Sequence, residues 1–453
     1  TPAKPDGYQP PRPVRHEGLR PVVVGFGPGG IFAALILAEA GLKPIVLERG
    51  LDAESRQKKV REFWETGKLD PSCNVQFGEG GAGTFSDGKL TTGIKSPCMG
   101  WILEQFHEAG ARENILFDAK PHIGTDVLVT VVQNLRKKIE SLGGEVRFGC
   151  RVTGLEQTMA HLTGLIYEQA GETVHLDCDR AILAIGHSAR DTFAMLLESG
   201  VPMEPKAFSM GVRIEHRQSW LDRRQYGDAA GHPSLPPADY KLAAHLPDGN
   251  SAYTFCMCPG GQVVASSSET GGVVTNGMSN ADRDGENCNA AVLVTLHPED
   301  FPFSGVLGGM EWQRQLEQRC YKAGGSNYHA PAQLVGDFLN HKASTKAASV
   351  RPTYAPGVTF TDLHDCLPEK ITDVLERALP ELEKKLPGFA DGDAVMTAPE
   401  TRSSSPVRIL RDETQQSALR GLFPCGEGAG YAGGITSAAV DGVRCAEALL
   451  QSL

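Results

Sequence analysis

A glycine-rich turn between an apolar strand and an apolar helix sets the strongest constraint on how this chain folds. The β-branched run Val22 to Val24 leads directly into Gly25-Phe26-Gly27-Pro28-Gly29-Gly30, and good helix formers follow from Ile31 to Ala40. A second apolar run, Ile45 to Leu47, closes a segment of about 30 residues, the length of one βαβ unit. Both runs are continuously apolar, which is typical of parallel strands covered on both faces. The sequence therefore predicts an α/β fold with a parallel sheet.

The turn itself has the G-x-G-x-x-G spacing of a dinucleotide-binding unit. Gly25 permits the tight turn, Gly27 lets the backbone approach a pyrophosphate, and Gly30 lets helix and strand pack closely. The N-terminus of the following helix offers unpaired N–H groups and a positive dipole to phosphates. Glu48 ends the second strand, where a carboxylate can accept hydrogen bonds from both ribose hydroxyls of an adenosine. An ordinary tight turn is the alternative, but the strand, helix and acid together favour a dinucleotide site.

Two further glycine clusters have the same spacing but a different setting. After Gly78 to Gly83 come the turn residues Thr84 to Gly88, so we expect a flexible loop that lies against a ligand. The cluster Gly428 to Gly433 lies between a strand and a helix predicted over about 435–450, near the end of the chain. Too few residues remain there for a complete βαβ unit, so this segment must complete a sheet begun elsewhere. We predict that it rejoins the N-terminal domain beside the first nucleotide site.

The composition and residue patterns along the chain predict four segments. Residues 1–18 are rich in proline and form an arm or linker. Residues 19–200 form the first part of the nucleotide-binding domain, with a helix over 128–142 and strands over 146–152 and 180–185. Residues 201–399 have polar loops, paired glycines and alternating strands such as 262–266, which indicates an inserted mixed α+β substrate or cap domain. Residues 400–453 complete the nucleotide-binding domain.

Composition narrows the class of partner. The 453 residues carry 44 basic and 55 acidic side chains, and the net charge of −11 repels nucleic acid and anionic lipid. The longest strongly apolar stretch, Ile31 to Ala38, is far shorter than the roughly 20 residues that cross a bilayer. The eleven cysteines include no C-x-x-C pair typical of a zinc or dithiol site. We expect a cytoplasmic protein with reduced thiols, a small-molecule substrate, no bound metal, no nucleic-acid partner and no membrane span.

These motifs carry a resemblance to a known class of flavoproteins. The run Gly25 to Glu48, the strand end Ala184-Ile185-Gly186 and the segment Phe423 to Gly428 resemble FAD-binding proteins of the glutathione-reductase structural type. The resemblance implies a Rossmann-like FAD-binding domain built from both ends of the chain, with the middle segment inserted. More narrowly, Gly78 to Leu90, Thr401 to Ile409 and the ending GEGAGYAGGITSAAVDG are similar to a bacterial group of predicted FAD-dependent dehydrogenases.

The resemblance also implies which residues contact FAD. The first glycines would hold the pyrophosphate, Glu48 the adenosine ribose with Arg49 beside it, and the backbone of Val152 the adenine. Glu427 occupies a place where many relatives carry Asp, and the helix that begins at Ile435 would point at the pyrimidine edge of the flavin, where its dipole favours the reduced ring. The full predicted set is Gly25, Gly27, Pro28, Gly29, Gly30, Glu48, Arg49, Gly80, Gly81, Gly83, Lys89, Val152, Ala184, Ile185, Gly186, Gly426, Glu427, Gly433, Gly434 and Ile435.

The candidates for catalysis are fewer and each has a simpler alternative. Cys256 and Cys258 are two residues apart and share a face of an extended strand, so they are candidates for redox chemistry or flavin contact, whereas buried free cysteines are common. His187 is a candidate proton donor, or a polar residue that satisfies a turn. Two basic groups are candidates for an anion site and an RNA site, or are solvated surface charge. They are Arg402, Arg408 and Arg411 with Ser403 to Ser405, and Arg213, His216, Arg217, Arg223 and Arg224.

The leading functional hypothesis is an FAD-dependent oxidoreductase, a dehydrogenase or reductase that passes a hydride through the flavin. The sequence has one convincing dinucleotide unit, so NAD(P)H as a transient electron donor would need a shallow site or a site in the inserted domain. One alternative is a tRNA-modifying flavoprotein that binds RNA through the basic residues at 213–224. Another is a non-catalytic sensor that holds FAD or NAD without turning it over.

Overall fold

The computed structural model describes residues 7–453, so the first six positions of the predicted arm lie outside the described residues. The rest of the arm, residues 7–18, contains neither helix nor strand but lies against the body of the protein. Tyr8 donates a hydrogen bond of 2.7 Å to Glu447 near the end of the chain, and the Val14 amide donates to the Ala40 carbonyl at 3.0 Å. These contacts join the arm to the end of the chain at Glu447 and to the segment after the first helix at Ala40.

Both ends of the chain build one parallel five-stranded sheet, in the order β19, β7, β1, β2, β3. The last strand pairs in register with β7, and β7 pairs with β1, so the C-terminal segment continues a sheet begun by the first strand. The α/β class and the parallel sheet predicted from the sequence are confirmed. The five strands are β1 (Val22–Val24), β2 (Ile45–Leu47), β3 (Glu145–Arg147), β7 (Ala181–Leu183) and β19 (Leu422–Pro424).

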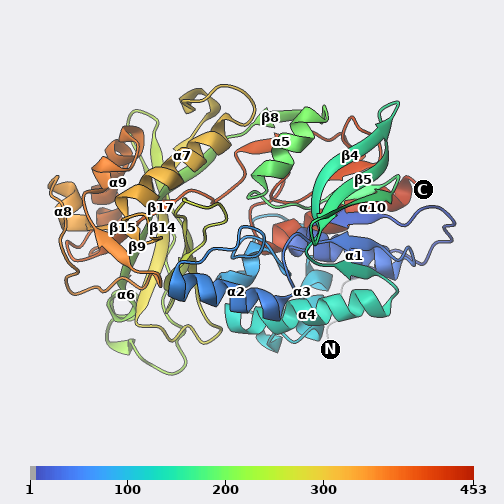
Figure 1. Ribbon diagram of the computed structural model, residues 1–453. Helices are drawn as coiled ribbons and strands as arrows, with labels where there is room; N and C mark the ends of the chain where they lie inside the picture. Colours follow the sequence, from blue (N-terminus) through green and yellow to red (C-terminus); the bar gives the residue numbers. More distant parts are fainter. Residues whose placement is uncertain (1–6) are drawn as a thin grey trace.

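Helices from the two ends of the chain pack directly against each other over this sheet. Helix α1 (Pro28–Glu39) lies beside α10 (Ile435–Gln451), as Figure 1 shows in blue and red. Ten of the twelve residues of α1 are buried, so the helix is apolar on every side, as its sequence predicts. The crossing is close because a Cβ on Gly442 would lie 2.2 Å from the Gly29 carbonyl oxygen. Glycine at this position therefore sets the distance between the two helices.

The predicted strand over 146–152 is wrong, because two strands of different sheets occupy this region. Gly149 has a φ of +68° and separates β3 from β4 (Arg151–Thr158). The second of these strands joins β5 (His161–Gln169) and β6 (Glu172–Asp177) in an antiparallel three-stranded sheet. A glycine in the left-handed region turns the chain out of the parallel sheet, which the strand-like residues on either side of Gly149 do not reveal.

The segment between the two halves of the parallel sheet forms a second, seven-stranded sheet, in the order β10, β11, β14, β9, β17, β15, β16. Its pairs are antiparallel except for β15 with β16. Its central strands are buried on both faces rather than alternating, because helices pack on the sheet. These seven strands are β9 (Phe208–Arg217), β10 (Ala243–His245), β11 (Ser251–Cys258), β14 (Asn287–Leu296), β15 (Ala330–Leu334), β16 (Val358–Phe360) and β17 (Val395–Glu400).

The remaining elements cover these sheets or connect them. The predicted strand over 262–266 appears as β12, paired with β13 in a separate hairpin. The predicted helix over 128–142 is α4, and the domain boundaries at 18, 200 and 399 stay predictions. The elements are α2 (Ala53–Thr66), α3 (Met99–Glu108), α4 (Thr125–Ser141), α5 (Arg190–Glu198), β8 (Met203–Pro205), α6 (Gln218–Tyr226), β12 (Gln262–Ala265), β13 (Thr275–Met278), α7 (Gly308–Ala323), α8 (Val335–Leu339), α9 (Glu369–Lys385), β18 (Val407–Ile409) and five short 3-10 helices.

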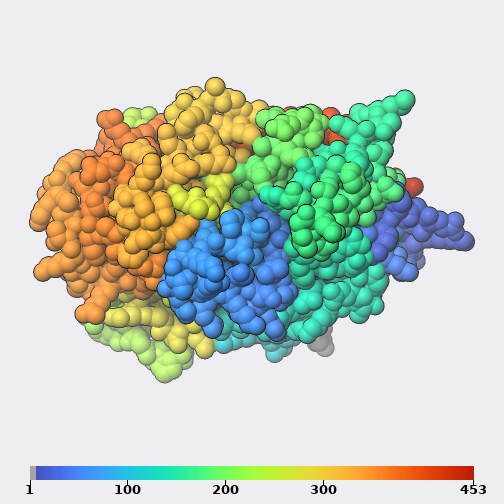
Figure 2. Space-filling model, viewed as in Figure 1, coloured from blue at the N-terminus to red at the C-terminus, as the bar shows by residue number. Residues whose placement is uncertain are grey.

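Helix α2 forms part of the contact between the two main sheets. In Figure 2 its blue surface adjoins the yellow and orange surfaces of residues from the second sheet region. The Trp64 indole donates to the Ala265 carbonyl at 2.9 Å, and the Phe63 ring meets Tyr328 edge-on at 5.0 Å. Apolar burial at this contact favours a fixed arrangement of the two sheets. Within residues 7–453, every helix is too short or too polar to span a membrane.

The close crossing of α1 and α10 predicts a difference between two glycine-to-alanine variants. Gly442→Ala puts a methyl group 2.2 Å from a backbone oxygen that cannot move without moving α1. We expect the free energy of unfolding to fall by about 1–3 kcal/mol, measured by urea denaturation. Gly100→Ala, in exposed α3, is the matched control because nothing lies within 4 Å of its Cβ position. Equal stability of the two variants would contradict the close packing.

Candidate functional site

A large cavity opens at the carboxyl ends of the parallel strands, between the two main sheets. Its volume is about 1290 Å³, which exceeds the roughly 300–1,000 Å³ of typical small-molecule pockets. The ends of β1, β2, β7 and β19 all reach its wall, as is usual for ligand sites in open α/β sheets. The opposite wall comes from β11, β13 and the loops beside them. The cavity has room for a dinucleotide and for a second molecule beside it.

Nearly all of the predicted cofactor residues meet at this cavity. Eighteen of the twenty line it, and the exceptions are Gly30 and Gly80. A Cβ on Gly30 would lie 1.9 Å from the Gly25 carbonyl oxygen, so this glycine serves helix packing. A Cβ on Gly80 would lie 2.1 Å from Thr84 Oγ1, inside its own loop. The structure brings these residues to one cavity, and their contacts with a cofactor stay predictions.

The first glycine turn has the geometry that a phosphate site needs. Gly25 has a φ of +96°, and a Cβ there would lie 2.2 Å from the Ala184 carbonyl oxygen, so only glycine fits. Gly27 is the N-cap of α1, Pro28 follows at the first turn, and no side chain from the described part of the protein caps this end. The helix therefore presents N–H groups to the cavity. A Cβ on Gly27 would lie 3.6 Å from the Gly81 Cα. Because both residues are glycines, the two backbones face each other with no side chain between them.

Glu48 joins three backbone segments at the end of β2. Its carboxylate accepts hydrogen bonds of 2.8 Å each from the amides of Phe26, Gly50 and Gly78. The side chain is 5% exposed and lines the cavity. Because a carboxylate has about four acceptor positions, three amides leave room for about one further hydrogen bond. The sequence predicts that this carboxylate binds two ribose hydroxyls, but the structure leaves acceptor capacity for about one.

Arg49 forms the outer wall of the same end of the cavity. Its guanidinium lies 4.4 Å from the centre of the Phe77 ring and donates to Asp191 at 2.7 Å and Thr192 at 3.1 Å. Burial alone would raise the pKa of Asp191, but the hydrogen bond and charge of Arg49 hold it below its usual value. The Arg49 charge is thus neutralised within the protein. A flat cation stacked on an aromatic ring is a surface against which a planar ring system can pack.

A fully buried arginine that sequence reasoning missed holds the glycine loop in place. Arg56, on α2, donates to the carbonyls of Asn74, Val75 and Glu79 at 2.7–2.9 Å. Burial lowers the pKa of this guanidinium to about 10, and nearby Glu48 opposes the shift. Because one planar group meets several carbonyls, it fixes the shape of the loop that follows. In the sequence, Arg56 looks like one of many charges on an amphipathic helix.

The loop over 78–90 presses onto both glycine-rich helix starts. Gly81 has a φ of +64°, and a Cβ there would lie 2.8 Å from the Gly27 Cα. A Cβ on Gly83 would lie 3.0 Å from the Ile435 side chain, at the start of α10. Part of this loop is a 3-10 helix, Ala82–Phe85, rather than the purely irregular loop predicted. The loop therefore closes the cavity over the N-termini of α1 and α10.

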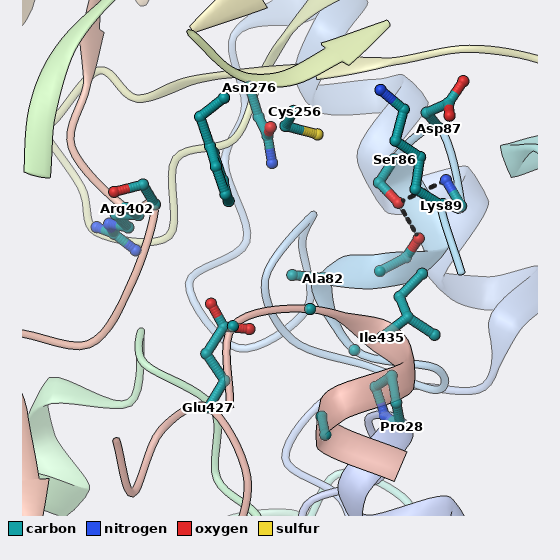
Figure 3. A pocket seen from close by; sticks show the side chains of 18 of the residues that line it. Pro28, Ala82, Ser86, Asp87, Lys89, Cys256, Asn276, Arg402, Glu427 and Ile435 are labelled. Carbon is teal, nitrogen blue, oxygen red and sulfur yellow. Dashed lines mark hydrogen bonds between the residues drawn. The ribbon is translucent and has the colours of Figure 1, made fainter. Parts of the chain in front are cut away.

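The wall formed by β11 and β13 carries a thiol and an amide, and the glycine loop brings a cation close to them. Figure 3 shows Cys256 and Asn276 on this wall, with Lys89 across from them and Ile435 and Pro28 below. The Lys89 ammonium donates to the Met257 carbonyl, so the glycine loop is tied to β11. Asp87 is fully buried and binds Arg283 at 2.9 Å. Of the two candidate cysteines, Cys256 lines the cavity and is partly exposed, whereas Cys258 is fully buried behind it.

His187 and Glu427 lie together where the loops after β7 and β19 meet. His187 Nδ1 is 3.5 Å from Glu427 Oε1, and both residues line the cavity. His187 Nε2 is buried and has no hydrogen-bond partner among residues 7–453. A Cβ on Gly428 would lie 2.3 Å from the Gly186 carbonyl oxygen, so the two loops touch through their backbones. Both of its predicted roles, proton donor and polar residue that satisfies a turn, stay predictions.

In the two basic groups, several side chains are buried ion-pair partners rather than solvated surface charge. Arg213 is fully buried and binds Glu400 at 2.7 Å, and His216 is 3% exposed, so no continuous basic face exists at 213–224. Arg411 binds Asp441 at 2.7 Å and stacks 3.7 Å from the centre of the Tyr431 ring. Opposite charges far apart in the sequence neutralise these residues, which local charge patterns cannot show.

Arg402 belongs to a buried ion-pair network that links the two main sheets. Glu317, on α7, accepts hydrogen bonds from Arg402 at 2.9 and 3.0 Å and from Arg190, on α5, at 2.8 and 2.9 Å. All three side chains are nearly or fully buried, and Arg402 also lines the cavity. Burial alone would raise the pKa of Glu317, but the two guanidinium groups hold it far below its usual value.

Two groups of metal-ligand side chains also lie close together among residues 7–453. Cys425, Asp441 and Cys445 are buried within 4.8 Å of one another, but Arg411 already supplies a cation to the carboxylate. The other group is His341, His364 and Glu376, on the far side of the second sheet. The sequence-based expectation of no bound metal stays a prediction.

Comparison with known proteins identifies the family. Over 434 residues the chain is 48% identical to an uncharacterized protein of Clostridium beijerinckii, covering 95% of this chain and 81% of the relative. The chain belongs to the same family as that protein. Residues 207–403 match the family described as "FAD-dependent protein, C-terminal domain-like". The description names FAD, and the prediction that FAD is the cofactor is confirmed.

The chain also has weak similarity to several solved structures. A triple mutant of a flavin-dependent brominase is 13% identical with a TM-score of 0.44, over 96% of this chain and 80% of that chain. A geranylgeranyl bacteriochlorophyll reductase-like protein of Thermoplasma acidophilum is 14% identical with a TM-score of 0.41, over 95% and 78%. The L-amino acid deaminase of Proteus vulgaris is 12% identical with a TM-score of 0.38, over 98% and 96%. These scores are too low to indicate an activity.

The buried network predicts a strong and pH-dependent effect of Glu317→Gln. The variant leaves the buried Arg402 without a carboxylate partner and Arg190 with Glu269 alone, so we expect a loss of about 3–5 kcal/mol in the free energy of unfolding at pH 7. The folded pKa of Glu317 lies below the unfolded value of about 4.3. Its stabilising effect is therefore complete above that pH and declines as the pH falls further. Denaturation of the parent protein and Glu317→Gln between pH 3 and pH 7 should show that their free energies of unfolding differ less at the acid end of this range.

Glu311→Gln is the matched control for this experiment, because Glu311 lies on the same helix and pairs with Arg314 at the surface. Surface ion pairs contribute about 0–1 kcal/mol, so the control should stay close to the parent protein. A Glu317→Gln variant as stable as Glu311→Gln at pH 7 would refute the role assigned to the network.

Proposed function

We propose that this protein is an FAD-dependent oxidoreductase whose substrate binds beside the flavin in the same cavity. The observation that carries the proposal is the meeting of the N-termini of α1 and α10 and the loop over 78–90 at one cavity of about 1290 Å³. Two helix N-termini that face one space favour an anionic, extended ligand such as a dinucleotide. The remaining space lies against β11 and β13, where polar side chains face the cavity.

The described residues fit FAD in an extended conformation. Glycine turns at Gly25 to Gly29 would hold the pyrophosphate on the N–H groups of α1, and Gly426 would approach it from the other side. The free acceptor position of Glu48 would take a ribose hydroxyl. Arg49 and Val152 would enclose the adenine. The start of α10 at Gly433 to Ile435 and the loop with Gly81, Gly83 and Lys89 would enclose the flavin ring.

FAD bound in this way would supply a ring that accepts or donates a hydride. The chain's own residues would bind and orient the reactants and exclude water. The helix dipole of α10 would favour negative charge near its N-terminus. The Lys89 ammonium, fixed by the Met257 carbonyl, would add a positive charge to the same region. Glu427 and His187 would orient each other at the base of the cavity, with the carboxylate facing His187 Nδ1.

Anaerobic mixing with reductants separates an enzyme from a sensor. Purified protein should carry FAD or take it up with a yellow colour. NADH and NADPH are then tried as hydride donors, and loss of flavin absorbance at catalytic rates would support an oxidoreductase that uses a nicotinamide donor. Persistent oxidation with every reductant tried would instead support a non-catalytic sensor. Protein that stays colourless after refolding with excess FAD would exclude the proposal altogether.

RNA modification is the weaker alternative because the structure removes its expected binding surface. Arg213 and His216 are buried, and Arg217 binds the carbonyl of Ser349 and the carboxylate of Glu286. The exposed residues that remain, Arg223 and Arg224, are too few for a positive face on a chain with a net charge of −11. We therefore propose no RNA substrate.

The role of Glu48 predicts how Glu48→Gln affects FAD binding. The amide cannot accept on both ends from Phe26, Gly50 and Gly78, so the turn and the loop lose a shared anchor. We expect FAD to bind about 10- to 100-fold more weakly, a loss of about 1.4–2.8 kcal/mol, measured by flavin fluorescence quenching. Glu54→Gln is the control, because Glu54 is exposed on α2 and lies away from the cavity lining. Unchanged affinity in Glu48→Gln would argue against this site.

A further inference from the structure

The cavity wall opposite the glycine turns contains two cysteines, Cys256 and Cys258, two residues apart on β11. Cys256 is partly exposed and lines the cavity, and Figure 3 shows its sulfur directed into the open space. Cys258 is fully buried immediately behind it. The Cys258 thiol donates a hydrogen bond of 3.3 Å to the Cys256 carbonyl oxygen, which places its sulfur beside Cys256. One sulfur is therefore accessible from the cavity, and the other can be reached only through the first.

An irregularity in β11 lies at these two cysteines. The pairing of β11 with β14 shifts register between Phe255 and Cys258, and Cys256 has a φ of +43°. In a regular strand, side chains two residues apart share a face but are separated by about 6.8 Å along the chain. The bulge breaks this regular geometry, and the Cys258 sulfur lies 3.3 Å from the Cys256 carbonyl oxygen. A left-handed conformation costs a non-glycine residue of order 1–3 kcal/mol, so the surrounding structure holds this geometry in place.

The charges around the pair make the two thiols unequal. The fully buried Arg213 donates to the Cys256 carbonyl at 2.8 Å, and Lys89 donates to the neighbouring Met257 carbonyl. The neighbouring Cys258 thiol lowers the pKa of Cys256 against the opposing effect of burial, and the Arg213 and Lys89 charges lower it further. The neighbouring Cys256 sulfur and burial raise the pKa of Cys258. The accessible sulfur therefore loses its proton more readily than the buried one.

No other cysteine offers this combination, and all eleven lie within residues 7–453. The other ten are buried, Cys258 among them. Burial raises the pKa of Cys73, Cys98, Cys150 and Cys178, which disfavours their thiolate forms. Another cysteine pair, Cys320 and Cys366, lies in the core cluster of the second sheet and away from the cavity lining. That pair is a natural internal comparison.

We propose that Cys256 and Cys258 form a thiol–disulfide exchange pair that acts on a low-molecular-weight disulfide in the cavity. Cys256 is the attacking thiolate, and it forms a mixed disulfide with one half of the substrate while the other half leaves as a thiolate. Cys258 then loses its proton and attacks Cys256 Sγ, which releases the second half as a thiolate that takes up a proton. The balance is one protein dithiol plus one disulfide giving one protein disulfide plus two thiols.

This inference rests on the proposed function only in placing the substrate in the same cavity, because the exchange itself uses no flavin. The exchange is reversible, so excess small thiol returns the pair to the reduced state. An attacking thiol of low pKa is suited to reaction at neutral and mildly acidic pH. The pair thus adds disulfide substrates to the chemistry available in the cavity.

The test is a single exchange on the FAD-loaded protein without oxygen. Reduced protein is mixed with 2-hydroxyethyl disulfide at several pH values, quenched with acid, alkylated and mapped by mass spectrometry. The peptide with Cys256 and Cys258 should lose two hydrogens, with two equivalents of 2-mercaptoethanol released. Cys258→Ser should stop at a mixed disulfide on Cys256, and Cys256→Ser should form none. The rate of adduct formation in Cys258→Ser should rise with pH according to the pKa of Cys256 in that variant.

The outcomes separate this inference from the proposed function. A peptide that keeps both thiols, or equal oxidation of the buried Cys320 and Cys366, overturns the exchange pair, even if the protein binds and reduces FAD. A mixed disulfide on Cys258 instead of Cys256 overturns the assignment of roles. Flavin absorbance recorded in the same samples reports on the cofactor independently. The parent protein alone decides the main point, so a variant that fails to fold leaves the test intact.

Discussion

The contact between α1 and α10 is the constraint on which the rest of the structure depends. Gly442 lets the second helix lie against the backbone of the first, and β19 pairs with β7 in the same register as β1 does. Because both helices follow their strands directly, their N-termini come to the same edge of the sheet. Each N-terminus alone is an ordinary anion site, whereas two facing one cavity favour a ligand with extended negative charge.

Two buried charged side chains then fix the loops that line the cavity. Glu48 accepts hydrogen bonds from the amides of three segments, and Arg56 donates hydrogen bonds to carbonyls of the loop beside them. Each would be costly to bury without these partners, so the loops and the charges stabilise each other. The network of Arg190, Glu317 and Arg402 does the same between the two sheets. The cavity wall formed by β11 and β13 is thereby held at a set position relative to the glycine turns.

The sequence predicted the parts of this site that depend on local backbone geometry. The glycine turn after β1, the helix start at Ile435 and the strand end at Ala184 all line the cavity, because spacing and β-branched runs are local signals. Contacts between distant residues were not predictable in this way. Arg56 looks like a surface charge, and Arg213 looked like part of a basic face, because their partners lie far away in the chain or on the backbone. The bulge at Cys256 depends on its pairing with β14, so the strand alone does not reveal it.

The account rests on one FAD molecule bound between the two ends of the chain. An experimental structure of the protein grown with FAD tests this most directly. The account predicts electron density for the two linked phosphates between the first glycine turn and the start of α10, with the adenine toward Arg49 and the flavin ring toward Lys89. Density for FAD elsewhere, or phosphates remote from either helix N-terminus, would contradict it.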